Sequence, residues 1–239
     1  MATTSTNQLA TDAFFHHVLS REPRVAVFDC DGTLWSNNSG LDFMHWEIEQ
    51  RLLPEGVGRE LLRRYELYEA GEVSEYDMCG EMVSVHDGLS VEQIVAACRK
   101  FAVECIEPNI FPEMFDLVQR LRSMGCELWA VSSTAAWVVR EGLVPFGIPP
   151  KRVLGVELAC SAGRATAELL AVPTDEHKAF AIAAAAIQPD AVFGNSIHDL
   201  AMLEVARTPY VINANPDLRE IAQQRGWVLF EPRHAIKNT

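Results

Sequence analysis

Basic residues are scarce in this chain of 239 residues: 20 Lys and Arg stand against 33 Asp and Glu, which gives a formal net charge of −13. Nucleic acids and anionic membranes attract basic surfaces, so the balance argues against both as partners. The shortage is greatest between residues 36 and 110, where 15 acidic residues accompany only 6 basic ones. The stretch has a net charge of −9, so most of the excess negative charge belongs to one part of the chain.

Long apolar runs, leader-like segments and paired cysteines are also missing. No apolar run approaches the roughly 20 residues that a membrane-spanning helix needs. The first residues have neither the basic region nor the apolar region of a signal peptide. The six cysteines show no CxxC spacing and are too few for a disulfide scaffold. We therefore expect reduced thiols, no signal peptide and a cytoplasmic protein.

Short apolar runs alternate with helical patterns along most of the chain. The runs do not alternate with polar residues, which is typical of strands buried on both faces of a parallel sheet. They cover residues 24–28, 127–131, 191–193, 210–212 and, more weakly, 227–230. The helical patterns cover 111–124, 135–143, 176–187, 197–206 and 216–224. This alternation predicts an α/β fold with a doubly wound parallel sheet.

One interval is too long for this rhythm, because about 100 residues separate the first strand from the second. Amphipathic helical patterns fill it at 41–53, 57–70, 74–85 and 91–104. A helical module inserted into the core explains the interval most simply. We predict a core domain of residues 1–38 and 108–239 and an all-helical cap domain of residues 39–107.

Two carboxylates, Asp29 and Asp31, directly follow the first strand. They lie at its carboxyl end, where open α/β sheets bind their ligands, and alternate positions project to the same side. Two carboxylates at so short a distance repel each other unless a proton or a cation separates them. Mg²⁺ suits such an all-oxygen site. Gly32 permits a sharp turn, and Thr33 offers a hydroxyl and an amide to an anion. The alternative is an Asp-Gly turn without a function.

Polar residues follow the second strand in the same position. Ser132 and Ser133 could bind a phosphate oxygen together with the amides of the next helix. The alternative is that they only cap the helix that begins near Ala135.

Further polar residues lie at a helix start and after the third strand. Lys178 is near the beginning of its helix, where the helix dipole disfavours a cation unless an anion is close. As a single residue it could equally be a solvated surface lysine. Asn195 and Asp199 supply oxygens that could complete a metal site, although Ser196 and Asp199 also have capping-box spacing. All these groups are expected at one edge of one sheet.

This ordered set resembles the haloacid dehalogenase-like hydrolase superfamily, in its phosphoserine-phosphatase-like branch with a helical cap (subfamily IB, C1 cap) on a Rossmann-like core. Residues 29–33 match the DxDGT motif, Ser132 the second motif, Lys178 the third, and residues 194–199 the fourth. The tail from Asn213 to Gly226-Trp227 is also similar to the closing segment of that branch.

The resemblance implies a Mg²⁺-dependent phosphatase that hydrolyses a small phosphorylated metabolite, a phosphomonoester. Asp29 would form an aspartyl-phosphate, and Asp31 would act as general acid and then as general base. The expected phosphate-binding residues are Thr33, Ser132, Ser133 and Lys178, and the expected metal site comprises Asp29, Asp31, Asn195 and Asp199. Two alternatives stay open: a phosphotransferase that uses the same intermediate, and a degenerate protein that binds a phospholigand without turnover.

Departures from the family pattern concern the metal and the substrate. Asn195 stands where many relatives have an aspartate, so we expect weaker Mg²⁺ binding. The glutamate that holds the amine in phosphoserine phosphatases falls at about Asn38 or Ser39, and their cap arginine has no match near residues 82–86. We therefore do not expect phosphoserine to be the substrate. An acidic, aromatic cap suits a small monoester, with or without an amine, better than a polyanion. The sequence does not indicate which oligomeric state the protein has.

Overall fold

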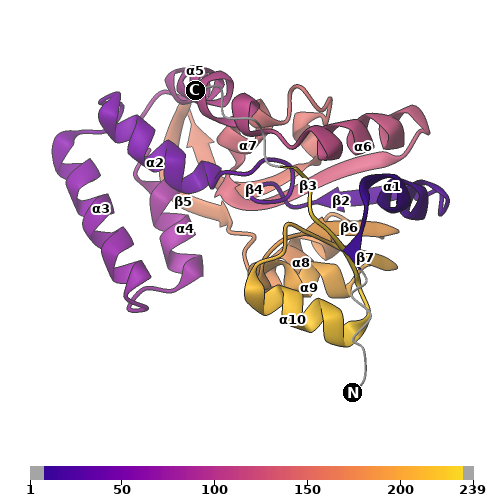
Figure 1. Ribbon diagram of the computed structural model, residues 1–239. Helices are drawn as coiled ribbons and strands as arrows, with labels where there is room; N and C mark the ends of the chain where they lie inside the picture. The colour runs from indigo at the N-terminus through magenta and orange to yellow at the C-terminus, as the bar shows by residue number, and fades with distance from the viewer. Residues whose placement is uncertain (1–7, 234–239) are drawn as a thin grey trace.

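The computed structural model describes residues 8–233, and these form an eight-stranded sheet covered by helices on both faces, with a helical cap at one end (Figure 1). The strands are β1 (Gln8–Leu9), β2 (Val25–Phe28), β3 (Glu127–Ala135), β4 (Val153–Ser161), β5 (Arg164–Ala171), β6 (Ala191–Gly194), β7 (Thr208–Ile212) and β8 (Val228–Phe230). The helices are α1 (Thr11–Leu19), α2 (Ser39–Glu49), α3 (Glu55–Glu69), α4 (Glu75–Ser84), α5 (Val91–Phe101), α6 (Pro112–Ser123), α7 (Ala136–Gly142), α8 (Glu176–Ala184), α9 (Leu200–Glu204) and α10 (Pro216–Arg225). The expectation about a leader segment concerns residues that lie partly outside this range.

The sheet has the order β1-β8-β7-β6-β2-β3-β4-β5, and all neighbouring strands are parallel except β4 and β5. The predicted doubly wound α/β fold is therefore confirmed. The five strands that the sequence indicated are β2, β3, β6, β7 and β8. Three strands were not predicted, and one of them, β5, adds an antiparallel edge.

Both faces of the central strand are buried, as its unbroken apolar sequence requires. In β2, Ala26 and Phe28 join the larger core under α1, α6 and α7, whereas Val27 joins the second core under α8, α9 and α10. Phe28 stacks on Phe193 of β6, with ring centroids 4.4 Å apart. This packing fixes the strand whose carboxyl end carries Asp29.

The cap consists of α2 to α5, inserted between β2 and β3, and it has its own small core around Met44, Leu61 and Met78. The predicted helical insertion is thus observed, while its boundaries at residues 39 and 107 stay a prediction. After α5 the chain continues as a π-helical turn, Ala102–Ile106, and a 3₁₀ turn, Glu107–Asn109, where the sequence had indicated helix to residue 104.

The β4–β5 hairpin braces the cap against the sheet. The Gly88 amide donates to the Ala165 carbonyl (2.9 Å), the Ala165 amide donates to Leu89 (3.0 Å), and the Val91 amide donates to Gly163 (3.0 Å). A Cβ atom on Gly80 of α4 would lie only 2.9 Å from Leu169. Close backbone contact between hairpin and cap therefore holds the cap over the carboxyl ends of the parallel strands.

Candidate active site

A cavity of about 430 Å³ lies between the cap and the carboxyl ends of the parallel strands. Residues from the loop after β2, from α2, α3 and α4, from the end of β3, from α8 and from the loop after β6 line it. Asp29, Asp31, Ser133, Lys178 and Asn195 all belong to its wall. The structure therefore brings most of the site residues expected from the sequence to one space.

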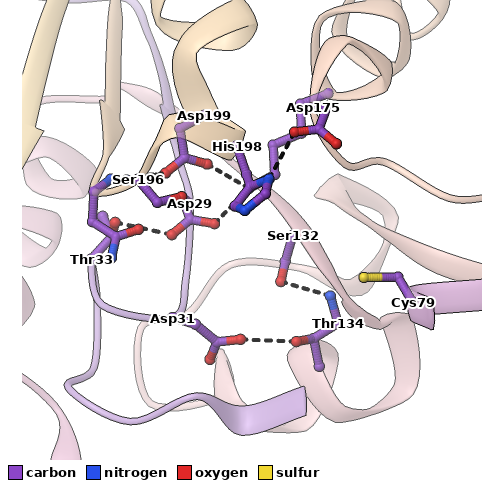
Figure 2. Close-up of polar contacts among 12 residues, drawn as sticks. Asp29, Asp31, Thr33, Cys79, Ser132, Thr134, Asp175, Ser196, His198 and Asp199 are labelled. Atoms are coloured by element: carbon purple, nitrogen blue, oxygen red, sulfur yellow. Dashed lines mark hydrogen bonds and ion pairs between the residues drawn. The ribbon is translucent and has the colours of Figure 1, made fainter. Parts of the chain in front are cut away.

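Asp29 is held by contacts to both of its carboxylate oxygens. Lys178 Nζ lies 2.8 Å from Oδ1, and the Thr33 hydroxyl donates to Oδ2 at 3.0 Å. The backbone amide of Asp29 donates to the carbonyl of Phe193 on the neighbouring strand (2.8 Å), so the backbone is fixed as well. Figure 2 shows Thr33 beside Asp29, which means that its hydroxyl orients this carboxylate and has a partner other than phosphate.

Lys178 is buried between two carboxylates, with 2% of its surface exposed. Its Nζ lies 2.8 Å from Asp29 and 2.5 Å from Asp199 Oδ1. These anions explain why a cation is tolerated near the start of α8, where the helix dipole opposes it. The alternative of a solvated surface lysine is wrong.

The electrostatic balance at this triad favours a cationic lysine and an unusually basic aspartate. Burial and the charge of Asp199 raise the pKa of Asp29 to about 7, against the opposing effect of Lys178. Burial works to lower the pKa of Lys178, but the charges and hydrogen bonds of Asp199 and Asp29 outweigh it and raise that pKa. Two carboxylates therefore share one ammonium group, so a further cation would find a favourable place beside Asp29.

Asp199 connects the lysine to the loop after β6. Its Oδ2 accepts hydrogen bonds from the amides of Asn195 (2.8 Å) and Ser196 (3.1 Å). The predicted capping box of Ser196 and Asp199 is present, so the structural and functional interpretations hold together. With Lys178 on Oδ1 and two amides on Oδ2, both oxygens of Asp199 already have partners.

Asp31 has a separate set of partners on the cap side of the cavity. Its Oδ1 accepts from the Trp35 indole (2.5 Å) and the Ser39 amide (2.8 Å), and its Oδ2 accepts from the Thr134 hydroxyl (2.8 Å). Figure 2 shows the side chains of Asp31 and Thr134 pointing toward one another. The two carboxylates of the DxD segment therefore have different environments, as two different roles would require.

The residues after the second strand do not cap a helix, contrary to the alternative that the sequence left open. Strand β3 continues through Ala135, and α7 begins without a side-chain cap. Ser133 and Thr134 line the cavity, whereas Ser132 is buried, with its hydroxyl accepting from the Thr134 amide (3.2 Å). Sequence reasoning missed Thr134 because its partner lies 103 positions away.

Gly32 and Asn195 are in close contact at the edge of the cavity. Gly32 has φ +75°, and a Cβ atom there would lie 2.0 Å from Asn195 Nδ2. Its carbonyl accepts from the Asn213 side chain (3.3 Å), and the Asn215 amide donates to the Asn195 carbonyl (2.8 Å). The closing segment of the chain thus supports both motifs.

Asp175 and His198 form a further pair that the sequence did not indicate. His198 Nδ1 lies 2.7 Å from Asp175 Oδ1, and Asp175 has a left-handed backbone with φ +48°. Since Asp175 precedes α8 and His198 follows β6, the pair ties the helix of Lys178 to the loop of Asp199.

The site offers oxygen atoms that could bind a hard cation, although they do not come from a cluster of ionisable side chains. Among residues 8–233, no group of three His, Cys, Asp or Glu side chains is placed to hold a metal ion. The candidates are instead mixed: a carboxylate from Asp29, the backbone carbonyl of Asp31 and the amide oxygen of Asn195. Oxygen donors of this kind fit Mg²⁺, which usually keeps water and substrate ligands as well.

None of the helices within residues 8–233 combines the length and the hydrophobicity that a membrane-spanning segment needs.

Comparisons with known proteins identify the family of the chain. The sequence profile described as haloacid dehalogenase-like hydrolase matches residues 26–204. A putative hydrolase of Mycobacterium leprae, ML2424, is 30% identical over 163 residues, which is 63% of this chain and 52% of that protein. The chain therefore spans about half the length of this relative.

Two further proteins are similar over most of their length. A histidinol-phosphatase of Neisseria meningitidis serogroup C is 24% identical over 215 residues, 85% of this chain and 96% of that protein. A solved structure described as a phospho-aspartyl intermediate analogue of phosphoserine phosphatase superposes with a TM-score of 0.57 at 16% identity and covers 90% of this chain and 95% of that one. The latter likeness concerns the fold.

Proposed function

Because the chain belongs to the haloacid dehalogenase-like hydrolase family, we propose that it is a phosphatase that cleaves a small phosphomonoester through an aspartyl-phosphate on Asp29. The observation that carries this proposal is the position of Asp29 on the cavity wall, with Lys178 on one carboxylate oxygen and Thr33 on the other. The names of two similar proteins, a histidinol-phosphatase and a phosphoserine phosphatase, support small phosphomonoesters as the substrate class.

The reaction has two displacements at phosphorus. In the first, a carboxylate oxygen of Asp29 forms a bond to phosphorus, the ester oxygen leaves, and Asp31 gives that oxygen a proton. In the second, water attacks phosphorus, its proton returns to Asp31, and the bond to Asp29 breaks. The separate hydrogen-bond environments of the two carboxylates support this division of roles.

Lys178 supplies fixed positive charge from a buried position beside Asp29. Its raised pKa keeps it cationic, so it can stabilise the oxygens of the transferring phosphoryl group as well as Asp29. Ser133, which lines the cavity, would donate to the same oxygens. Ser132 and Thr33 would act indirectly. The Ser132 hydroxyl accepts a hydrogen bond from the Thr134 amide, and the Thr33 hydroxyl donates one to Asp29.

Mg²⁺ is the cofactor that the available oxygens suit. The groups that would hold it are the Asp29 carboxylate, the Asp31 carbonyl and the side-chain oxygen of Asn195. Asp199 would act indirectly, because it accepts a hydrogen bond from the backbone amide of Asn195 and pairs with Lys178. When bound, the ion would offset the repulsion between the Asp29 carboxylate and the phosphate. It would also lower the pKa of Asp29 and so favour its nucleophilic form.

Phosphate release from an aryl phosphate tests the proposal directly. We expect turnover that depends on Mg²⁺ in the wild type, loss of turnover in Asp29→Asn, and acid-stable label on wild-type protein after brief exposure to a labelled substrate. Failure of a broad panel of monoesters to turn over with metal would instead support phospholigand binding without catalysis. Transfer of the label to an added alcohol, at the expense of free phosphate, would support the phosphotransferase alternative.

A further inference from the structure

The cap side of the cavity has two carboxyl groups and no lysine or arginine. Among the described residues that line the cavity, Lys178 is the only lysine or arginine, and it lies at the phosphate end beside Asp29. The cap contributes two carboxylates, Glu47 and Glu75. The remaining cap residues on this wall are phenolic, sulfur-containing or apolar: Leu41, Phe43, Met44, Tyr65, Tyr68, Met78, Cys79, Met82 and Val83.

Glu47 of α2 is fully buried and is paired with a histidine that is equally buried. Its Oε2 lies 2.7 Å from Nε2 of His86, and Nδ1 of His86 lies 2.9 Å from the carbonyl of Val83. Since a carbonyl can only accept a hydrogen bond, Nδ1 must carry a proton. One further proton is then shared between Nε2 and Oε2, either as imidazolium with carboxylate or as imidazole with carboxylic acid.

The second oxygen of Glu47 is the unusual atom. Oε1 is buried and has no hydrogen-bond partner within residues 8–233. In both protonation forms of the pair Oε1 is an acceptor, and a buried acceptor without a donor is unfavourable. Burial raises the pKa of Glu47, against the effect of the His86 hydrogen bond, which agrees with a carboxyl group that lacks donors. A donor brought by a ligand would satisfy this atom.

Glu75 adds charge to the same wall without offering a second unfilled position. Tyr68 donates its hydroxyl to one carboxylate oxygen, and the Cys79 thiol donates to the other at 3.5 Å. The rings of Tyr65 and Tyr68 also line the cavity. The Glu75 carboxylate, the unpaired oxygen of Glu47 and the two tyrosines together favour a cation over a neutral group.

We propose that Glu47, held in place by His86, is a specificity-determining residue that binds a cationic nitrogen in the alcohol part of the substrate. The substrate class is then a phosphomonoester of an amino alcohol that has no carboxylate beside its amine, because the cap side of the cavity has no cation to pair with one. This inference rests on the proposed phosphatase function and extends it to the leaving group.

Matched substrates test the inference in the unmodified protein. A series of ω-aminoalkyl phosphates of increasing chain length is compared with the ω-hydroxyalkyl phosphates of the same lengths, with O-phosphoserine and p-nitrophenyl phosphate in parallel. We expect kcat/KM for the best amine to exceed that of its hydroxyl counterpart by about tenfold or more, the usual effect of a charged hydrogen bond. Equal values across the series, or a preference for O-phosphoserine, would overturn the inference.

Variants assign the preference to one carboxylate. In Glu47→Gln, the ratio of kcat/KM for amine over hydroxyl should fall toward one, with the loss mainly in KM for the amine. Glu49→Gln, on the exposed side of the same helix, should keep the wild-type ratio. A ratio that persists in Glu47→Gln contradicts the assignment, and thermal melting shows whether that variant folds. If it does not fold, the wild-type comparison still tests the substrate class, and equal kcat/KM values for amine and hydroxyl substrates overturn the proposal. Failure of the phosphatase proposal differs, since p-nitrophenyl phosphate would then show no metal-dependent turnover.

Discussion

Replacement of Lys178 by methionine should destabilise the protein strongly, because it removes the ammonium group that two buried carboxylates share. Lys178 Nζ lies 2.8 Å from Asp29 and 2.5 Å from Asp199. Methionine has a similar length but no charge, so the change leaves these anions without compensation. Removing one partner of a buried ion pair usually costs about 3–5 kcal/mol. For a chain of this size, each kcal/mol lowers the melting temperature by roughly 2–4 °C.

The difference in the free energy of unfolding between wild type and Lys178→Met should grow as the pH rises. Burial and Asp199 raise the pKa of Asp29 from its ordinary value of 3.8 to about 7. For a carboxyl group with a raised pKa, the stability from its protonated form is complete below the ordinary pKa and disappears as the pH passes the raised one. Lys178 lowers the pKa of Asp29, so its removal raises that pKa further. Lys178→Met should therefore differ least from wild type near about pH 5 and most near about pH 8.

Urea unfolding followed by tryptophan fluorescence in metal-free buffer measures this effect. Lys151→Met is the matched control, because Lys151 is exposed and its replacement should change the free energy of unfolding little. A Lys178→Met protein as stable as wild type at the higher pH would show that the carboxylates are not compensated in the way described. A loss of the same size at both pH values would show that Asp29 does not titrate in the way described.

Three further substitutions test individual contacts. Gly32→Ala should abolish most activity, since its Cβ would overlap Asn195, whereas Gly71→Ala, with the same φ of +75° and open space, should show only a stability loss of about 1–2 kcal/mol; equal activity in the two variants would refute the role of the contact. Asn195→Asp should tighten the apparent Mg²⁺ constant in an activity titration, and an unchanged constant would remove Asn195 from the metal site. Thr134→Val should lower kcat for alkyl phosphates by about tenfold but less for p-nitrophenyl phosphate, whose leaving group needs little protonation, because Thr134 positions Asp31; an equal loss on both substrates would contradict this.

The central sheet and its ligand-binding edge were predictable because their signals are local. Each buried parallel strand carries an uninterrupted apolar run, and the polar residues that follow it must meet at one sheet edge. The positions of Asp29 and Asp199 follow from that rule, whereas Lys178 lies near a helix start, and the chemical roles of all three stay predictions. Strand β5, Arg164–Ala171, has no such signal. Its Ala, Glu and Leu residues favour helix, and only pairing with β4 and the cap makes it a strand.

The contacts that shape the cavity were not predictable, because they join residues far apart in the sequence. Thr134 lies 103 positions from Asp31, and His86 lies 39 positions from Glu47. A buried histidine and a buried glutamate in separate amphipathic helices look like ordinary polar residues until the helices pack. The signal that could have drawn attention to Glu47 is its place among apolar neighbours on α2, which includes the buried Phe43 and Met44.

The negative charge of the sequence acquires a specific meaning once its location is known. Its excess lies in the region of the cap, and two of those carboxylates, Glu47 and Glu75, face the same cavity as the buried Lys178. A phosphate placed against Lys178 would extend its alcohol toward a wall that has the Glu75 carboxylate, an unpaired oxygen of Glu47 and no lysine or arginine, which suits a cation better than a second anion. Zwitterionic phosphomonoesters match both ends of such a cavity, whereas phosphorylated acids and nucleotides match only one. Charge along the cavity, more than its volume, should therefore decide which phosphomonoesters are hydrolysed.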